Sequence, residues 1–234
     1  MKWVYKTKFN PDGTIQKQKA RLAAKGYSQQ PKIDYSETFA PVTRLDTIRA
    51  VIALATQREW NIYQMDVKLA FLNGVFEEEI YVEQPQGLIN KGNEGKALRL
   101  KKTLYGLKEA PQAWYSKIDQ YFIDQGFKRS KSKPTLYIKA QGQYHLIVSL
   151  YVDDLIYTRN NLEMMKEFKE DMMKTFEMND LGLMNYFLGI EVKQQEDSIF
   201  IFQKKYIAVL LKKFKIYDCK LFATPLVLNE ATKR

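Results

Sequence analysis

The stretch Leu146–Thr158 constrains the fold more than any other, because it places two adjacent carboxylates between two apolar runs. The runs Leu146–Val152 and Leu155–Thr158 are rich in residues that favour strands, and Asp153 and Asp154 lie between them. This pattern predicts a β-hairpin with an acidic tip. A buried carboxylate is unfavourable and an adjacent carboxylate adds repulsion, so a partly buried pair is expected to have a cation as its partner.

A second acid lies in a similar apolar setting, because Asp66 stands between Met65 and Val67. Two strands that each bring a carboxylate to one point would form a site for paired divalent cations. The Asp153-Asp154 dipeptide also fits an exposed acidic turn without any cation. The two residues alone do not decide between these interpretations.

The charge of the chain indicates a polyanionic partner. The 234 residues are 45% hydrophobic and 27% charged, a composition that predicts a folded chain with a substantial core. The formal net charge is +10, from 37 Lys and Arg against 27 Asp and Glu. Nucleic acid is the leading candidate, since contacts of Lys and Arg with phosphates supply most non-specific affinity. A basic surface that only keeps the chain soluble is the alternative.

Cysteine and histidine exclude several kinds of site. Cys219 is the single cysteine, which excludes an intrachain disulfide and a cysteine-based zinc site. His145 is the single histidine, which excludes a histidine-rich metal site and a Ser-His-Asp triad. No apolar run reaches the roughly 18 residues of a membrane-spanning helix, and no signal peptide opens the sequence. These features predict a soluble intracellular protein without a membrane partner.

The chain is expected to begin with a β-hairpin. Strand-like runs at Lys2–Phe9 and Ile15–Leu22 flank the turn sequence Asn-Pro-Asp-Gly at 10–13. Alternate positions of a strand point the same way, so three cations share one face of the second strand: Lys17, Lys19 and Arg21. They could hold a triphosphate or a template backbone, or they could protect an edge strand from aggregation.

Several later elements follow from periodicity and capping patterns. Thr43–Asp46 matches a capping pattern in front of an apolar helical stripe, and Asn161 can cap another helix. A strand over Ile62–Val67 places Asp66 near its C-terminal end, beside a turn or helix start that could receive phosphate oxygens. Lys68 adds charge there or is a surface lysine.

Further elements are predicted toward the C-terminus. A helix with an apolar stripe from Trp114 to Phe122 is expected to stop at Gly126. Leu181-Gly182 predicts a turn that leads into one strand over Tyr186–Lys193, which is followed by a strand over Ser198–Gln203. A last helix carries an apolar stripe between residues 207 and 214, with lysines around it that track a nucleic-acid backbone or face solvent.

Seven short motifs occur in a fixed order along almost the whole chain. They are Lys19–Leu22 with Lys25–Gln29, Glu37–Val42, Gln64–Lys68, Ala70–Gly74, Leu104–Lys108, Tyr151–Asp154 and Tyr186–Glu191. In this order they resemble the reverse transcriptases of Ty1/copia-type long-terminal-repeat retrotransposons. Each motif is weak by itself, and their combination is specific.

The resemblance implies an α+β fold of the right-hand polymerase type, with an antiparallel sheet, packed helices and a thumb that is largely absent. The reverse transcriptase domain would occupy residues 1–234. Its fingers would lie at about 1–58 and 80–115, and its palm at about 59–79 and 116–234.

The resemblance also implies the site residues. Asp66, Asp153 and Asp154 would be the catalytic acids, and together with the Val67 carbonyl they would hold two Mg²⁺ ions, with Mn²⁺ as the alternative ion. The implied nucleotide-binding residues are Lys19, Arg21, Val67, Lys68, Phe71, Tyr105 and Gly106. Among these, Lys19 and Arg21 would close on the triphosphate, and Phe71 would exclude a 2′-hydroxyl group. Gly106 has no Cβ, so a planar substrate could approach its backbone closely, although turn geometry also explains a glycine there.

The implied activity is RNA-directed DNA polymerisation within a Pol polyprotein. A nucleotidyltransferase of this kind transfers nucleotides from dNTPs to a primer 3′-hydroxyl by a two-metal-ion mechanism. The implied partners are an RNA template, a DNA primer or template, dNTPs, and the ribonuclease H and integrase segments of the polyprotein. The implied location is the cytoplasm, in virus-like particles, with a nuclear phase.

Two alternatives remain open from the sequence. The chain could be an inactive relic or a repurposed palm that binds nucleic acid, and an isolated fragment could be incomplete. Glu109, Gln112 and Asn179 depart from the usual copia-like pattern, and their effect is not readable from sequence. A metal-dependent nuclease or integrase-like recombinase would instead need a catalytic glutamate in the helix after the acidic pair: Glu163, Glu167 or Glu170.

Overall fold

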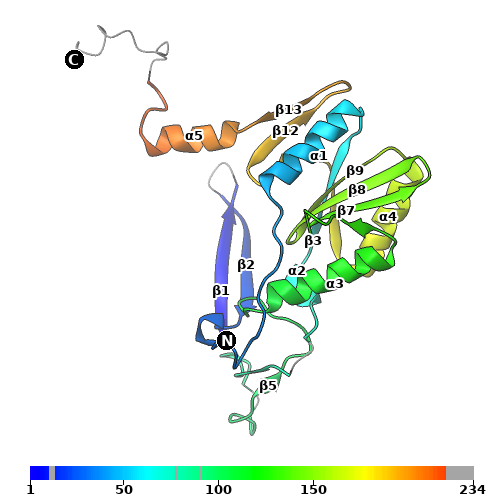
Figure 1. The fold of residues 1–234 in the computed structure, drawn as a ribbon. Coiled ribbons are helices and arrows are strands. Elements are labelled where there is room, and N and C mark those ends of the chain that lie inside the picture. The colour runs from blue at the N-terminus through cyan, green and yellow to red at the C-terminus, as the bar shows by residue number, and fades with distance from the viewer. Residues whose placement is uncertain (11–13, 77–78, 90, 220–234) are drawn as a thin grey trace. The chain divides into compact units, whose positions relative to one another are not determined.

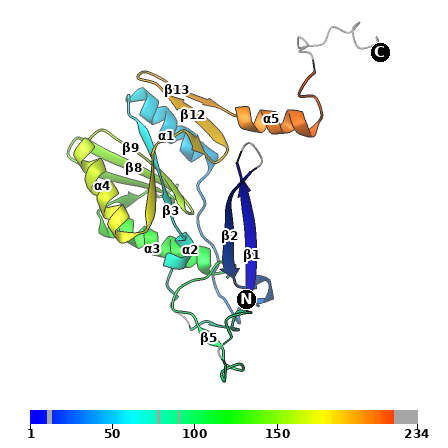
Figure 2. The same ribbon diagram turned by 180° about the vertical axis from the view of Figure 1, so that it is seen from behind.

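The computed structural model divides the chain into two units, Met1–Leu183 and Met184–Arg234. The described residues are 1–10, 14–76, 79–89 and 91–219. Both units combine helices with antiparallel strands (Figure 1; Figure 2), which confirms the predicted α+β class. Among the described helices, none has the length and apolarity that crossing a membrane requires.

An antiparallel sheet of six strands forms the centre of the first unit, in the order β10-β3-β9-β8-β7-β6 (Figure 1). The strands are β3 (Ile62–Val67), β6 (Lys128–Arg129), β7 (Leu136–Gln141), β8 (Tyr144–Tyr151), β9 (Asp154–Arg159) and β10 (Met178–Leu183). Strands β8 and β9 pair directly, so the predicted hairpin around the two acids is confirmed.

Helices α3 (Ala110–Asp124) and α4 (Leu162–Thr175) pack on one face of this sheet (Figure 2). Their apolar stripes bury Ile118 and Phe168 together with Met65 and Val67 of β3. Side chains alternate between the two faces of a strand. The even-numbered positions of β3, including Asp66, therefore point to the opposite face.

One predicted helix cap is confirmed and another is wrong. The Asn161 side chain accepts a hydrogen bond from the Met164 backbone N–H at 2.9 Å and caps α4. Helix α1 (Leu45–Gln57) instead begins after Arg44, without a side-chain cap. Thr43 does not cap it, because its buried hydroxyl bonds with the Leu150 carbonyl and with Thr135. A long-range bond to the sheet replaces the local one.

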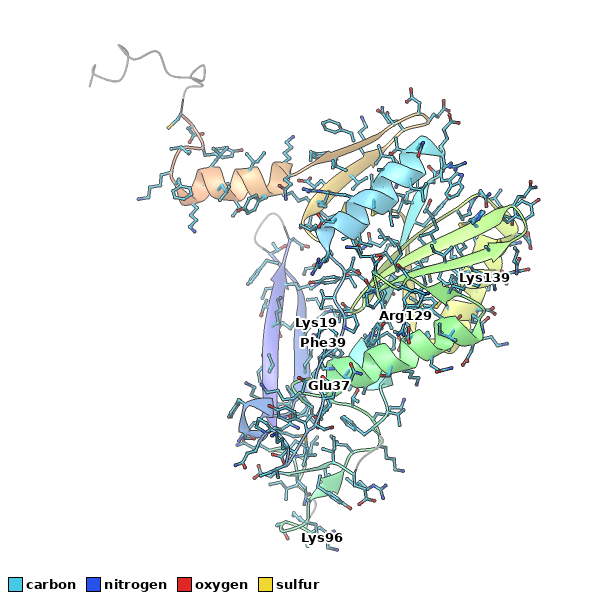
Figure 3. The ribbon with its side chains drawn as sticks, viewed as in Figure 1. Lys19, Glu37, Phe39, Lys96, Arg129 and Lys139 are labelled. Carbon is cyan, nitrogen blue, oxygen red and sulfur yellow. The ribbon has the colours of Figure 1, made fainter. Side chains whose placement is uncertain are left out.

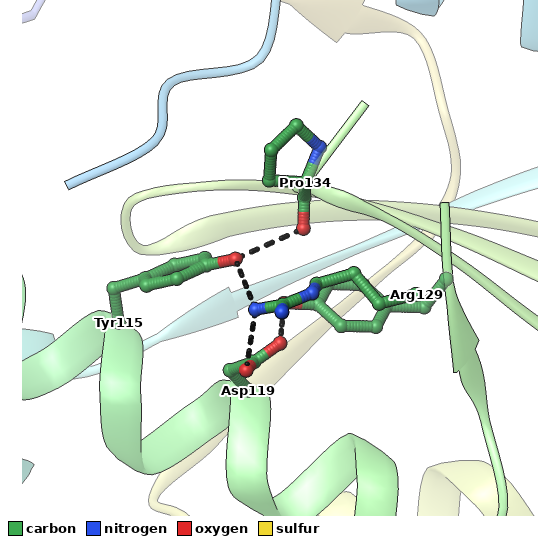
Figure 4. A network of polar contacts seen from close by, with 5 residues as sticks. Tyr115, Asp119, Arg129 and Pro134 are labelled. Carbon is green, nitrogen blue, oxygen red and sulfur yellow. Dashed lines mark hydrogen bonds and ion pairs between the residues drawn. The ribbon is translucent and has the colours of Figure 1, made fainter. Parts of the chain in front are cut away.

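A polar network ties α3 to strands β6 and β7 (Figure 4). Arg129 donates to the Asp119 carboxylate at 2.8 Å, and the Tyr137 hydroxyl donates to the same carboxylate at 2.8 Å. Tyr115 donates to the Pro134 carbonyl at 3.0 Å. Burial raises the pKa of Tyr137 far above its ordinary value, so this fully buried hydroxyl stays protonated and needs an acceptor.

We expect Asp119→Ala to destabilise the fold by about 1–3 kcal/mol, because it leaves the buried Tyr137 hydroxyl without its acceptor. Urea unfolding of the variant measures this change. Asp124→Ala is the matched control, since Asp124 lies on the same helix and is exposed. Equal unfolding midpoints for the two variants would contradict a structural role of the network.

Shorter elements complete the first unit. They are β1 (Lys2–Phe9), β2 (Ile15–Ala23), the 3₁₀ turn Gly26–Ser28, α2 (Ala70–Asn73), β4 (Tyr81–Val82) and β5 (Leu98–Arg99). Strands β1 and β2 pair antiparallel, which confirms the predicted N-terminal hairpin. Its predicted turn lies mainly outside the described residues, which exclude 11–13.

The second unit differs from the prediction over Tyr186–Lys193. The segment forms two short strands, β11 (Tyr186–Phe187) and β12 (Ile190–Gln194), instead of one. Leu188 and Gly189 both have positive φ, as a tight two-residue hairpin turn requires. β12 also pairs with β13 (Ile199–Phe202), and α5 (Lys204–Lys213) follows as predicted.

The predicted turn at Leu181-Gly182 is also wrong, because both residues belong to β10. The register of β10 against β3 shifts between Asp180 and Gly182, and Gly182 has a φ of +70°. The glycine accommodates a bulge in an edge strand, which does not end there.

Candidate active site

The strand register brings two of the predicted acids side by side. Asp66 on β3 lies directly opposite Asp154 on β9. On its other side, Asp66 lies opposite Asn179 on β10. Asp66 and Asp154 are 88 positions apart in the sequence. Antiparallel pairing of β3 with β9 makes them neighbours on one face of the sheet.

Asp153 lies in the tight turn that joins β8 to β9. The last cross-strand pair of this hairpin is Tyr151 with Asp154, so Val152 and Asp153 form the turn. The Val67 backbone N–H donates to the Asp153 carbonyl at 2.8 Å, which fixes the turn against the end of β3. Val152 has a φ of +55°, an uncommon conformation for a β-branched residue.

A buried tryptophan of α3 is hydrogen-bonded to the strained turn. The Trp114 indole N–H donates to the Val152 carbonyl at 2.7 Å, and only 1% of this side chain is exposed. The helix that contains Trp114 was predicted and is confirmed, but this contact was not predicted. The hydrogen bond stabilises the Val152 conformation that places Asp153 at the tip.

The electrostatic environment disfavours the charges of both turn acids. Burial raises the pKa of Asp153, the charge of Asp66 adds to the rise, and Arg21 opposes it. Burial also raises the pKa of Asp154, with further contributions from Asp153 and Asp66 and an opposing hydrogen bond from Gln64. The three acids are therefore close enough to interact, and their mutual repulsion is only partly compensated within the chain.

A cation from the N-terminal hairpin and two aromatic rings, one from α2 and one from the segment before α3, lie close together. The Arg21 guanidinium lies 4.9 Å from the centre of the Tyr105 ring, and this ring lies 5.2 Å from that of Phe71. Burial raises the pKa of Tyr105, and the charges of Asp153 and Asp66 raise it further while Arg21 lowers it. These residues therefore share one electrostatic neighbourhood with the acids.

Lys19 and Arg21 are two positions apart on β2, so they share one face of the strand. The pKa of Lys19 is lowered mainly by Lys8, and Asp66 opposes that shift. The charges of Lys19 and Arg21 therefore lie near enough to the acids to influence pKa values, and their binding of a triphosphate stays a prediction. Lys17, on the same face, has no contact with this site among the described interactions.

Gly26 and Gly106 allow close contact between two backbone segments. The chain just after β2, which is the base of the N-terminal hairpin, crosses the segment before α3 at these glycines. The Ala24 N–H donates to the Tyr105 carbonyl at 2.7 Å. A Cβ on Gly26 would lie 1.8 Å from the Gly106 oxygen, and a Cβ on Gly106 would lie 2.4 Å from the Ala24 oxygen. Gly106 also has a φ of +93°. Backbone contact therefore explains this glycine directly, without a substrate.

Gln29 fastens the same crossing to the start of α3. Its side-chain oxygen accepts from the Lys108 N–H at 2.8 Å, and its amide donates to Glu109 at 3.0 Å. The glutamate is buried and its other carboxylate oxygen has no partner among the described residues. Glu109 thus stabilises the junction between hairpin and helix. Nothing in the structure explains the choice of glutamine at Gln112.

Lys68 is an exposed lysine that has an acidic partner. It forms an ion pair with Glu177 at 2.9 Å, and its backbone N–H donates to the Glu177 carbonyl at 2.8 Å. Both side chains are substantially exposed, so the pair is expected to be weak and readily exchanged.

An apolar cavity of about 290 Å³ lies beside the acidic turn. Its walls include Phe71, Pro111, Trp114, Leu150 and Val152, and the connector residues 38 and 40–42 complete it. The cavity has no charged side chain in its lining, so it suits the apolar edges of a ligand rather than phosphate groups.

The donor set fits a divalent cation in its chemistry. The candidate donors are carboxylate oxygens of Asp66, Asp153 and Asp154 and the Val67 carbonyl, and Mg²⁺ and Mn²⁺ prefer oxygen ligands. A bound cation would offset the burial and repulsion that raise the pKa values of the turn acids. Within the described residues, however, no three His, Cys, Asp or Glu side chains are already grouped to hold a metal ion.

Sequence reasoning missed two amides that contact the acids. The Asn179 amide donates to Asp66 at 3.2 Å, and the Gln64 amide donates to Asp154 at 3.3 Å. Gln64 carried a readable signal, because it is polar within an apolar strand and shares the face of Asp66 two positions away. Asn179 was noted only as a departure from the usual pattern, because β10 was not predicted.

The fold and these residues define an α+β chain with an acidic site on an antiparallel sheet, opposite a cationic hairpin. A family model described as "Reverse transcriptase (RNA-dependent DNA polymerase)" matches residues 1–228. The chain therefore belongs to this reverse transcriptase family.

Known relatives support the copia-type resemblance. The chain is 38% identical over 228 residues to a "Retrovirus-related Pol polyprotein from transposon RE2" of Arabidopsis thaliana, which covers 97% of this chain and 16% of the relative. It is 38% identical to the polyprotein from transposon TNT 1-94 of Nicotiana tabacum, over 96% of this chain and 17% of the relative. A transposon Ty1-DR4 Gag-Pol polyprotein of Saccharomyces cerevisiae is 30% identical over 79% of this chain and 11% of its own length. No solved structure matches the chain.

Proposed function

We propose that this chain is the RNA-directed DNA polymerase domain of a copia-type retrotransposon Pol polyprotein. It would extend a DNA primer with dNTPs on an RNA or DNA template. The observation that carries the proposal is the pairing of Asp66 with Asp154 across β3 and β9, with Asp153 in the adjoining turn. The chain spans about 16% of the Arabidopsis RE2 relative, so the activity of the whole polyprotein is part of the proposal.

Each group of residues has a distinct part in the proposed reaction. Asp66, Asp153 and the Val67 carbonyl would hold two Mg²⁺ ions, with Asp154 in support, and the ions would supply positive charge to the attacking 3′-oxygen and the leaving pyrophosphate. Lys19 and Arg21 would bind the triphosphate of the incoming nucleotide as cations. Lys68 would join them after exchanging Glu177 for a phosphate oxygen.

The aromatic pair and the glycine crossing would form the nucleotide pocket. Phe71 and Tyr105 lie in ring contact, and the Tyr105–Gly106 backbone is fixed by Ala24. A base or sugar would pack on these rings, and template strands would be held by backbone and shape contacts. In a right-hand polymerase fold, residues of about 1–58 and 80–115 would form the fingers. Residues of about 59–79 and 116–234 would form the palm.

The names of the relatives indicate the wider setting of the domain. Those names describe Pol polyproteins. We expect the chain to act beside ribonuclease H and integrase segments, in cytoplasmic virus-like particles with a nuclear phase. These partners and this location stay predictions.

Primer extension on an RNA template with Mg²⁺ or Mn²⁺ tests the proposal. A folded chain is expected to lengthen a labelled primer only when dNTPs and a divalent cation are present. The proposal is rejected if the chain binds primer–template but adds no nucleotide while an active reverse transcriptase does so in parallel. That outcome would favour a domain that only binds nucleic acid.

Phe71→Val is expected to raise ribonucleotide incorporation relative to dNTP incorporation by roughly 10–100-fold, because a smaller side chain leaves room for a 2′-hydroxyl. Single-nucleotide addition with dNTP and rNTP measures the ratio. Phe39→Val is the control, since Phe39 is 69% exposed and lies between the 3₁₀ turn and α1 (Figure 3). An unchanged ratio in the Phe71 variant would remove Phe71 from the sugar pocket.

A further inference from the structure

Asn179 is held beside Asp66 by the edge of the sheet. Strand β10 pairs with β3, and this register sets Asn179 directly opposite Asp66. The Asn179 amide nitrogen lies 3.2 Å from the Oδ2 atom of Asp66, and both residues are partly buried. The neighbouring Lys68–Glu177 backbone bond of 2.8 Å fixes the start of β10 against the end of β3.

The next residue, Asp180, anchors the same strand by two further contacts. Asp180 forms an ion pair with Lys169 of α4, and its carboxylate also accepts from the Gly182 N–H at 3.0 Å. The strand is therefore fixed by backbone pairing, by an ion pair and by the bulge that Gly182 permits. Asn179 accordingly presents its amide to one carboxylate oxygen from a restrained backbone.

We infer that Asn179 is a positioning residue, which holds Asp66 Oδ2 and thereby sets how tightly the acidic site binds a divalent cation. This inference rests on the proposed function, because it takes Asp66 to be a cation ligand. It goes further in assigning a determinant of cation affinity to a residue that is not itself a ligand.

The chemistry of an amide suits this task. An amide N–H group donates to a carboxylate without neutralising its charge, and it occupies one lone pair of Oδ2 while Oδ1 stays available. The amide must present nitrogen to the carboxylate, since its oxygen would repel the charge. Hydrogen bonds of this kind orient metal-binding carboxylates, and their removal typically weakens metal binding by roughly 10–100-fold.

Other side chains at this position would act differently. Leucine has a similar size but leaves Asp66 free to rotate. Lysine would keep a donor to the Asp66 carboxylate and add a positive charge beside it. The two substitutions therefore separate the effect of losing the donor to Asp66 from the effect of adding a positive charge beside it.

The test is a titration of the full chain with Mn²⁺, with the unbound ion measured by electron paramagnetic resonance at fixed pH and ionic strength. Asn179→Leu is expected to weaken binding by roughly 10–100-fold, whereas Asn179→Lys, which keeps a donor to Asp66, is expected to weaken it less. Leu181→Lys is the matched control, because it adds the same charge to an exposed position of the same strand. It is expected to change affinity by less than about threefold, since exposed charges are strongly screened.

Primer extension supplies a second measurement. Asn179→Leu is expected to raise the Mg²⁺ concentration for half-maximal rate, while saturating Mg²⁺ restores most of the rate. A role in folding only would instead lower the rate at every Mg²⁺ concentration, together with the urea midpoint, and would overturn the inference. Unchanged Mn²⁺ affinity in a folded Asn179→Leu variant would also overturn it.

The proposed function fails by a different result. If the folded wild-type chain binds no Mn²⁺ and extends no primer, the acids are not a cation site and both assignments fall. If the wild-type chain does both and the Asn179 variants behave identically, only the inference about Asn179 falls.

Discussion

Asp153→Asn is expected to reduce primer extension by roughly a thousandfold or more, because the substitution removes a charged oxygen ligand from the proposed cation site. Asparagine has nearly the same size, so the β8–β9 turn keeps its shape. The half-buried charge of Asp153 is disfavoured by burial and by Asp66, so the variant should be at least as resistant to urea as the wild type. Rate measurements at saturating dNTP and Mg²⁺ give the effect.

Primer–template binding separates the polymerase from a domain that only binds nucleic acid. We expect Asp153→Asn to bind primer–template within a few-fold of the wild type and with the same dependence on salt, since binding depends mainly on cations. Asp197→Asn, in the exposed β12–β13 connection, is the control for removing a charge. Undiminished synthesis by the Asp153 variant would show that this acid is not part of the reaction.

Gly106→Ala is expected to destabilise the chain by about 2–4 kcal/mol and to abolish most synthesis. The positive φ contributes about 1–2 kcal/mol, and the displaced Ala24–Tyr105 hydrogen bond adds to it. The new Cβ would lie 2.4 Å from the Ala24 oxygen, so the hairpin base must move away from Tyr105. Urea unfolding and primer extension measure the two effects.

Gly126→Ala isolates the conformational part of this effect. Gly126 follows α3 with a φ of +80°, and a Cβ there would meet no atom within 4 Å. Its substitution should cost only about 1–2 kcal/mol and leave synthesis intact at a temperature where the chain stays folded. If both alanine variants lose the same stability and keep the same activity, the crossing does not position the hairpin.

Local sequence signals predicted the elements that carry the acids. The apolar runs around Asp153 and Asp154 predicted their hairpin, and the Met65-Asp66-Val67 pattern predicted a strand with an acid near its end. These predictions succeeded because alternation and turn chemistry are local properties of the chain. The resemblance then predicted that the acids belong together, and the strand register places Asp66 and Asp154 opposite each other.

The contacts that support the acids were not predictable in the same way. Strand β10 lies at the sheet edge, contains a bulge and leaves Leu181 and Leu183 exposed, so it lacks the alternation that identifies a strand. The bonds of Thr43 to Leu150 and of Trp114 to Val152 join residues 107 and 38 positions apart. Long-range partners of this kind override local preferences such as the capping pattern at Thr43.

The left-handed backbone at Val152 sets stability and activity against each other. Glycine would adopt a φ of +55° without the steric penalty that a branched side chain has there. The valine side chain, however, forms part of the wall of the 290 Å³ cavity beside the acids. Selection for a more robust fold would therefore favour glycine at this position, whereas selection for a correctly shaped wall would retain valine.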